Sequence, residues 1–392
     1  MPKNWKTYKL SEALEIKYGK DHKKVSDGDI PIYGTGGIMR FGNQFLYDDE
    51  SILIPRKGSL NNIYYLNKPF WTVDTLFWSK INKEIVFPKY LFYNLKILDF
   101  ANMDVGTAIP SLTTKLLNKI EVNIPPLPEQ KAIANILSTI DDKIENNLAV
   151  NKTLEDMAMA LYKHWFVDFG PFQDGEFIDS ELGLIPKGWE MKSVYSIAQF
   201  VNGAAFKSKD FLDNRSLGLP VIKIVEIKQG ITSQTKYSNK ELDEKYVIKN
   251  NDILFPWSGN PHTSLGIHLW DKGKAFLNQH IFVVRVNDSN SKCFVFNTLK
   301  NLLPTFVNLA THKQTTGLGH ITVSNLKELK ISIPNNKIIK KYENVASPLM
   351  KKIYNNQIES NKLTKFRDTL LPMLISGEVR LKEFQEEIEN VM

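Results

Sequence analysis

The sequence predicts an α+β protein built as a tandem repeat, in which two mixed, β-rich units are each followed by a long helix. The tetrapeptide PKNW at residues 2–5 returns as PKGW at 186–189. The segment SLTTKLLNKIEVNIP at 111–125 matches HITVSNLKELKISIP at 320–334, at a constant offset of 209 residues. An amphipathic helical pattern follows each matched segment, so the repeat covers the whole chain.

Four parts follow from this repeat: a β-rich unit over 1–125, a helix and linker over 126–184, a second β-rich unit over 185–334, and a second helix with a tail over 335–392. The linker is the stretch GPFQDGEFIDSELGLIPKG, rich in Gly, Pro and Asp. Within the β-rich units, SILIPRKGSLNN is echoed by DILFPWSGNPHT, and TVDTLFW by LNQHIFVV. Each echo reads as a short strand, and the first pair places a proline and a polar loop after it.

Composition limits the class of protein. The chain has 392 residues, a formal net charge of +7 and a single cysteine, Cys293. One cysteine excludes an intrachain disulfide and a thiolate zinc cluster. No apolar run is long enough for a membrane helix, and the N-terminus lacks a signal-peptide pattern, so we expect a cytoplasmic protein. The positive charge favours an anionic partner.

Both helical patterns carry apolar residues at spacings of three, four or their sums, close to a heptad seam. The residues concerned are Ile133, Leu137, Ile140, Ile144, Leu154, Leu161 and Trp165 in the first helix, and Tyr342, Leu349, Ile353, Leu363, Phe366, Leu370 and Leu374 in the second. A helix of roughly 40 residues would be about 60 Å long. Because each helix has one apolar stripe to bury, we expect the two to pack as an antiparallel coiled coil, related by a pseudo-two-fold axis.

Two asparagines interrupt the apolar stripes. Asn147 lies on the seam of the first helix, and Asn356 holds the equivalent place in the second. Buried asparagines in coiled coils fix register and orientation at a cost in stability. The alternative is that both lie at the edge of the seam, in solvent. Pro348 and Pro372 predict a kink or interruption in the second helix.

Catalytic motifs are missing. There is no G-x-x-x-x-G-K-[ST] loop and no H-E-x-x-H, and the seven histidines show no ligand spacing. The glycines at 34–37 predict a turn. Asp243 and Lys245 have the acid-x-lysine form found in nucleases, but their charged surroundings favour a solvated face. Two binding-sized units with a spacer and without a catalytic set indicate a recognition protein that measures or bridges something.

Three junctions resemble those of the specificity subunits of type I restriction–modification enzymes. IPPLPEQ at 124–130 followed by KAIANILSTIDDKI resembles the family's central conserved region. FVDFGPF at 166–172 followed by SELGLIPKGWE is similar to the passage into its second recognition domain. TLLPMLISGEVRL at 369–381 is similar to its distal conserved region.

The resemblance implies two target recognition domains, each reading one half of a bipartite site on double-stranded DNA. It implies that two modification subunits dock on the helices and methylate adenine N6, and that restriction subunits join for ATP-dependent cleavage. S-adenosylmethionine, ATP and magnesium would belong to those partners, and this chain would hold no cofactor or metal and no membrane contact. Partner and spacer residues would be the helical positions Pro128, Gln130, Ile133, Leu137, Ile140, Ile144, Asn147, Leu154, Leu161, Leu349, Ile353, Asn356, Leu363 and Leu370.

Candidate DNA contacts lie in the matched loops. Phosphate contacts need cations, and base reading needs paired donors and acceptors on a loop that enters the major groove. In the first unit the candidates are Lys20, Lys23, Lys24, Arg40, Arg56, Lys57, Ser59, Asn61 and Asn62, with Asp74 and Thr75 on the facing strand. In the second they are Lys207, Lys209, Trp257, Ser258, Asn260, His262, Thr263 and Gln279, with His280. Because the loops differ, we expect two different half-sites.

One departure from the family pattern is the second junction, IPNNKIIKKYENV, which lacks the Pro-Glu-Gln element. It predicts a weaker or differently shaped second docking surface. Two other functions stay open at this point: a scaffold that binds only proteins, and a nuclease that uses Asp243 and Lys245.

Overall fold

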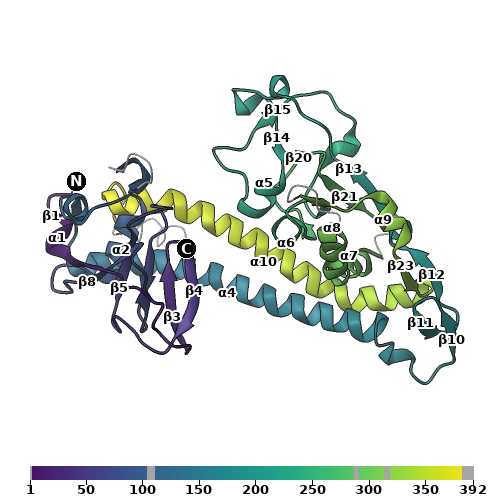
Figure 1. Cartoon of the computed structure of the whole chain (residues 1–392). Coiled ribbons are helices and arrows are strands. Elements are labelled where there is room, and N and C mark those ends of the chain that lie inside the picture. The colour runs from purple at the N-terminus through teal and green to yellow at the C-terminus, as the bar shows by residue number, and fades with distance from the viewer. Residues whose placement is uncertain (1, 104–110, 287–290, 313–317, 382–392) are drawn as a thin grey trace, which may run out of the picture. The chain divides into compact units, whose positions relative to one another are not determined.

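The computed structural model describes residues 2–103, 111–286, 291–312 and 318–381, and the tail after 381 lies outside the described residues. The chain forms two compact units (Figure 1). Unit 1 comprises residues 1–145 and 361–392, and unit 2 comprises residues 146–360. Each unit therefore combines one β-rich lobe with part of both long helices.

The lobe of unit 1 contains a four-stranded sheet of order β2-β8-β5-β6, a three-stranded sheet of order β4-β3-β7, and the pair β1-β9. Its central strand β5 is buried along its whole length, which explains the apolar run SILIP. The elements are β1 (Lys6–Lys9), α1 (Leu10–Ala13), β2 (Leu14–Tyr18), β3 (Ile30–Gly34), β4 (Gly37–Gly42), β5 (Ser51–Pro55), β6 (Tyr64–Leu66), β7 (Trp71–Thr72), β8 (Leu76–Ile81), α2 (Pro88–Lys96), α3 (Thr114–Leu117) and β9 (Glu121–Ile124).

The lobe of unit 2 contains four-stranded sheets of order β13-β21-β17-β19 and β15-β14-β20-β16, with the pairs β12-β23, β18-β22 and β10-β11. The elements are β10 (Phe177–Ser180), β11 (Gly183–Pro186), β12 (Glu190–Ser193), β13 (Gln199–Asn202), β14 (Leu219–Ile222), α5 (Ile224–Gln229), β15 (Tyr237–Ser238), β16 (Val247–Ile248), β17 (Ile253–Pro256), β18 (Ser258–Gly259), α6 (Pro261–Ser264), β19 (His268–Leu269), β20 (Ala275–Leu277), β21 (Ile281–Arg285), α7 (Lys292–Asn301), α8 (Leu303–His312), β22 (Gly319–His320), α9 (Val323–Glu328) and β23 (Lys330–Ile333).

The two lobes share one strand topology, which confirms the predicted repeat. The antiparallel pair β1-β9 corresponds to β12-β23, and the run β2-β8-β5 corresponds to β13-β21-β17. Even the parallel pairs correspond, since β3 lies parallel to β7 and β14 lies parallel to β20. The glycine-rich stretch forms the predicted turn, between β3 and β4, where Gly37 has a φ of 111°.

Two long helices complete the fold: α4 (Leu127–Phe166, 40 residues) and α10 (Asn336–Ser376, 41 residues). The predicted interruption of the second helix is wrong, because α10 continues through both Pro348 and Pro372. Both prolines are exposed. The carbonyl groups that lose their helical partner can therefore bind water.

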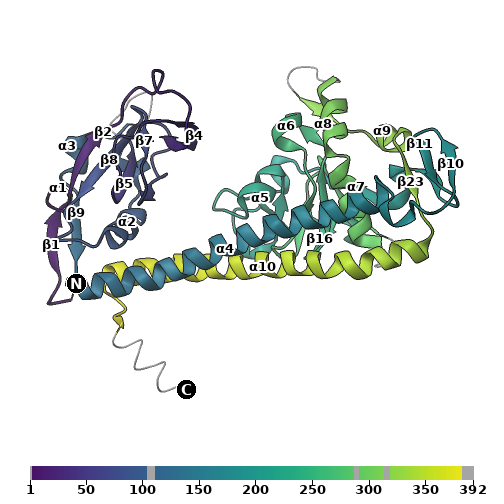
Figure 2. The same ribbon diagram turned by 90° about the horizontal axis from the view of Figure 1, so that it is seen from below.

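In unit 2, α4 and α10 lie side by side and antiparallel, as both views show (Figures 1 and 2). The Asn147 amide donates to Glu359 at 2.9 Å and to the Ser360 hydroxyl at 3.3 Å, and the Asn356 amide donates to Asn151 Oδ1 at 2.9 Å. Both seam asparagines are 2% exposed, so the solvated alternative is wrong. Asn356 and Ser360 follow Asn147 and Asn151 by 209 residues, so these bonds are related by the repeat.

Apolar contacts flank this network in unit 2. Tyr162 and Phe166 near the end of α4 pack on Tyr342 near the start of α10, with ring centroids 6.3 and 4.8 Å apart. Ile353 is buried and its carbonyl accepts a bond from the Asn151 amide at 3.1 Å. Leu161 packs half-buried against the same core.

In unit 1 the same two helices pack through leucine, isoleucine and alanine. The buried cluster that they share with the lobe includes Ile133, Ala134, Leu137, Ile140, Leu370, Leu371, Leu374 and Ile375, with Ile144 and Leu363 partly buried beside it. Asp141 accepts bonds from Arg367 Nη1 at 2.6 Å and from the Tyr93 hydroxyl at 2.7 Å. Burial, together with this bond, raises the pKa of Tyr93. The Asp141 carboxylate therefore links α4 to α10 by an ion pair and to α2 by a hydrogen bond.

Three predicted seam positions are less buried than expected. Phe366 is 51% exposed, because the adjacent Arg367 takes the place that faces α4. Leu349 is only half-buried, and Met350 occupies the core beside it. The buried stripe of α10 runs from Ala346 to Met350, four residues later. Alanine is a weak apolar signal, so the spacing of large apolar residues in the sequence pointed to Leu349 instead. Leu154 is also half-buried.

Gln130 acts inside unit 1. It is 1% exposed; its Nε2 donates to Ile85 O at 3.0 Å and Pro125 O at 2.8 Å, and its Oε1 accepts from Phe87 N at 2.6 Å. Gln130 is therefore too buried to contact a partner directly, which corrects its predicted partner-binding role. The neighbouring Pro128 is exposed. In the second copy, Glu343 accepts a comparable bond from Phe294 N at 2.8 Å, although the Pro-Glu-Gln element is missing.

We expect Gln130→Ala to destabilise the protein by about 3 kcal/mol, because it leaves buried backbone groups without hydrogen-bond partners. The urea midpoint should fall with an unchanged slope. Gln44→Ala, which removes an exposed amide from the same unit, is the control and should change stability by less than about 0.5 kcal/mol. Equal midpoints for the two variants would contradict the role of Gln130.

We expect Asn151→Ala and Asn356→Ala to show a coupling energy of about 0.5 to 1.5 kcal/mol in a double-mutant cycle, because their side chains share a buried hydrogen bond. Urea denaturation of the four proteins gives the value. A cycle between Asn151 and Lys341, an exposed residue near the start of α10, should be additive. Additivity at Asn151 and Asn356 would show that their contact contributes nothing.

Candidate nucleic-acid interface

In unit 1, Arg56 directly follows the proline that ends β5. Its backbone N–H donates to Thr75 O at 2.8 Å, and its carbonyl accepts from Leu112 N at 2.9 Å. The guanidinium donates to Asp74 O at 3.3 Å and lies 5.5 Å from the Tyr18 ring centroid. Hydrogen bonds therefore fix the Arg56 backbone, and the contacts with Asp74 and Tyr18 position its side chain. Arg56 stays half-exposed.

A glycine permits close approach of the chain beside Arg56. A Cβ on Gly19 would lie 2.0 Å from Val73 O, so no other residue fits there. Lys20 then donates its N–H to Thr72 O at 2.9 Å. The result is a hollow of about 720 Å³, here called the first hollow, whose lining includes Lys23, Thr35 and Asp74.

In unit 2, Trp257 takes the place of Arg56. Its N–H donates to His280 O at 3.2 Å, and its carbonyl accepts from Ile321 N at 2.8 Å. The indole Nε1 donates to Asn202 Oδ1 at 2.9 Å. Asn202 therefore supports Trp257 as Tyr18 supports Arg56.

The glycine is repeated too. A Cβ on Gly203 would lie 2.3 Å from the carbonyl oxygen of Asn278. The second hollow, of about 520 Å³, lies beside it and is lined in part by Asn202, Lys240, Trp257, Gln279 and His280. The Lys240 ammonium is paired with Asp210 at 3.1 Å, so it serves the framework. The two hollows therefore occupy equivalent places and differ in chemistry.

The predicted phosphate-binding lysines border these hollows along the chain. Lys20, Lys23 and Lys24 lie exposed between β2 and β3, and Lys207 and Lys209 lie exposed between β13 and β14. Because β2 corresponds to β13, the two groups hold equivalent places.

Arg40 is used within its own lobe. Its guanidinium donates to His22 O at 2.9 Å, to Val25 O, and to Asp27 at 2.8 Å. These contacts brace the loop that carries Lys23 and Lys24. The structure thus gives Arg40 a positioning role for that loop.

Three asparagines that were predicted to contact DNA form hydrogen bonds within the protein. Asn61 Nδ2 donates to Asp99 at 3.3 Å, and Asn62 Nδ2 donates to Thr35 O at 3.2 Å. The Asn260 side-chain oxygen accepts two backbone N–H groups and caps α6. Lys57, Ser59, His262 and Thr263 are exposed, and Ser258 pairs with His320 between β18 and β22.

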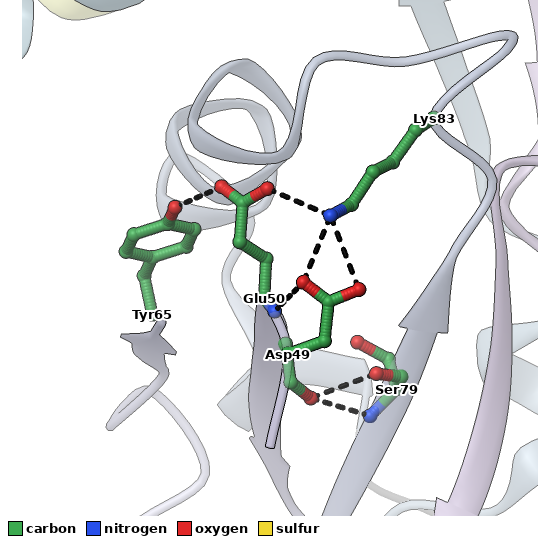
Figure 3. A network of polar contacts seen from close by, with 6 residues as sticks. Asp49, Glu50, Tyr65, Ser79 and Lys83 are labelled. Atoms are coloured by element: carbon green, nitrogen blue, oxygen red, sulfur yellow. Dashed lines mark hydrogen bonds and ion pairs between the residues drawn. The ribbon is translucent and has the colours of Figure 1, made fainter. Parts of the chain in front are cut away.

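Two acidic residues, Asp49 and Glu50, precede β5 at the end of the strand away from Arg56 and take part in a network of polar contacts (Figure 3). Lys83 binds Asp49 at 2.9 Å and Glu50 at 3.0 Å, and Tyr65 donates its hydroxyl to Glu50. These hydrogen bonds raise the pKa of Lys83, and the Lys83 contact lowers that of Asp49. The single ammonium of Lys83 thus balances one of the two carboxylate charges, at the end of the strand away from Arg56.

The two residues that the nuclease alternative would use lie exposed. Asp243 and Lys245 form an exposed ion pair at 2.9 Å, which matches the predicted solvated face. Within the described ranges no group of three or more His, Cys, Asp or Glu side chains could hold a metal ion. In the same part of the chain, no helix has the length and apolar character to cross a membrane.

Four residues that support Arg56 and Trp257 were not predicted from the sequence, namely Tyr18, Asn202 and the two glycines after them. A signal was present, because Y-G and N-G each end a strand at the 184-residue offset that relates PKNW to PKGW. Asn151 and Ser360 lie four residues after the predicted Asn147 and Asn356, one helical turn further along the same stripes, and that spacing is the signal that could have found them.

Comparisons with known proteins agree with this architecture. A family model described as the type I restriction modification DNA specificity domain matches residues 2–156 and 186–365. The specificity subunit of the type I restriction enzyme MjaIX of Methanocaldococcus jannaschii is 28% identical over 98% of this chain and 95% of its own length. That of the HindI enzyme of Haemophilus influenzae is 24% identical over 92% of this chain and 88% of its own length.

Among solved structures, the S subunit of a type I restriction–modification system from M. genitalium has the same fold, with a TM-score of 0.61 at 17% identity. That alignment covers 95% of this chain and 96% of the other. The repeated lobes, the paired helices and the match of the family model to both copies lead to one conclusion: the chain belongs to the type I restriction modification DNA specificity family.

Proposed function

We propose that the chain reads a bipartite, asymmetric site on double-stranded DNA and positions modification subunits for adenine N6 methylation. The observation that carries this proposal is the pair of hollows, equivalent in backbone position and unlike in side chains. Equivalent frameworks suit two segments of one duplex, and unlike side chains suit two different half-sites.

Affinity and specificity would come from different residues. The exposed lysines beside each hollow would contact phosphates, which supply affinity without sequence information and make binding salt-dependent. Side chains at the hollows would contact base edges in the major groove. The net charge of +7 supports such a polyanionic partner.

The helix pair would set the distance between the two half-sites and offer the docking surface for modification subunits. With about 60 Å of helix, the half-site centres would lie one to two DNA turns apart. The methyltransferase chemistry, with S-adenosylmethionine, would belong to the modification subunits, which must take the adenine out of the duplex. ATP and magnesium would serve restriction subunits. The chain itself would act without a cofactor.

Methylome sequencing tests the proposal in a host that lacks other adenine methylation. The chain and its modification subunits together should produce one bipartite, non-palindromic N6-methyladenine motif, and omission of the chain should abolish it. Modification subunits expressed alone are the control. A methylome that does not depend on the chain would refute the proposal and favour a scaffold that binds proteins only.

A matched insertion tests the spacer role. Seven residues added to both α4 and α10, about 10.5 Å of helix, should lengthen the gap of the motif by about three base pairs. The same insertion in the turn between β10 and β11 is the control and should leave the gap unchanged. An unaltered gap after the helical insertion, with methylation retained, would contradict a spacer role for the helices.

A further inference from the structure

We propose that each lobe reads a base pair with two residues at equivalent backbone positions. In unit 1 these are Arg56 and Asp74, which specify a G·C pair, and in unit 2 they are Trp257 and Gln279, which specify an A·T pair. The inference rests on the proposed function, and it names the base chemistry of each half-site.

Strand register establishes the equivalence. Pro55 at the end of β5 faces Leu76, and Pro256 at the end of β17 faces Ile281. Arg56 and Trp257 each follow that proline. Asp74 and Gln279 each lie two residues before the facing strand residue.

Hydrogen bonds hold the two members of each pair close together. Arg56 N donates to Thr75 O, the residue after Asp74, and Trp257 N donates to His280 O, the residue after Gln279. In both lobes, therefore, the two proposed readers project from neighbouring backbone segments at one end of the sheet, beside the hollow.

The chemistry in unit 1 suits a G·C pair. The Arg56 guanidinium carries five N–H donors, of which the bond to Asp74 O uses one. Its position against the Tyr18 ring restricts its rotamers, so it is prepared for a bidentate contact with guanine O6 and N7. The exposed Asp74 carboxylate can accept a bond from cytosine N4 on the other strand.

The side chains in unit 2 cannot read a G·C pair in the way proposed for Arg56 and Asp74. The indole Nε1–H of Trp257 already donates to Asn202, so the indole offers only an apolar surface, which suits the thymine methyl group. The exposed Gln279 amide has the donor and acceptor that bind adenine N6 and N7. Its Nε2 lies 3.3 Å from His280 Nε2, a contact that orients the amide.

Methylome sequencing of single variants in the reconstituted system tests this inference. Arg56→Ala and Asp74→Ala should relax the same G·C position in one half of the motif and leave the other half unchanged. Gln279→Ala should relax an A·T position in the other half only. Each lost contact should reduce discrimination at its position by about 5- to 150-fold. The untouched half of the motif is an internal control.

Lys68→Ala is the matched charge control, because Lys68 is exposed and follows β6 at the end of the sheet away from Arg56. It should leave both halves intact. If Arg56→Ala abolishes methylation altogether, competition binding by the purified complex with Arg56→Met, which keeps much of the side-chain length but has no N–H donor, decides. Relaxation at one G·C position supports the inference, and full discrimination overturns it.

The outcomes separate the two proposals. If the unmodified chain directs no bipartite methylation, the proposed function itself fails and this inference falls with it. If the unmodified chain directs it and the Arg56, Asp74 and Gln279 variants keep the motif unchanged, only the assignment of readers is overturned.

Discussion

The reciprocal hydrogen bonds between α4 and α10 are the constraint on which the rest of the architecture depends. Asn147 contacts Ser360, and Asn356 contacts Asn151, and all four side chains are buried. Apolar stripes alone would tolerate a slip along the helices, since one leucine packs much like another. A slip here would leave buried amides unpaired, which costs more than the bonds contribute, so the network selects one register.

Duplication explains why the network is reciprocal. Each helix presents an asparagine followed four residues later by a second polar side chain, and antiparallel packing brings the two sets together. The same duplication gives each lobe a proline-ended central strand, a glycine where two backbones approach, and an equivalent position directly after the proline, Arg56 or Trp257. Bonds through backbone atoms carry this shared framework, so it is indifferent to the side chain at that position. Arg56 and Trp257 make the same two backbone bonds.

Sequence reasoning predicted the fold well where a pattern repeats over many residues. The repeat, both long helices and the buried asparagines followed from periodicity and a constant offset. It failed where an outcome depends on three-dimensional neighbours. Phe366 fitted the apolar period but is exposed, because Arg367 reaches Asp141. Gln130 was predicted to be a partner or spacer residue but satisfies backbone groups of its own lobe. No sequence pattern states which polar side chains the protein uses internally.

That internal use narrows the set of residues left to recognise a partner. Arg40, Asn61, Asn62 and Asn260 would all suit a nucleic acid by type, yet each holds a loop in place. A loop fixed by several internal bonds loses little entropy on binding, so contacts made from it contribute more of their energy to affinity. Recognition can then rest on very few side chains. On the proposed assignment of Arg56 and Trp257, such a lobe would acquire a new specificity by exchange of one or two residues, because other residues make the hydrogen bonds that define the loop.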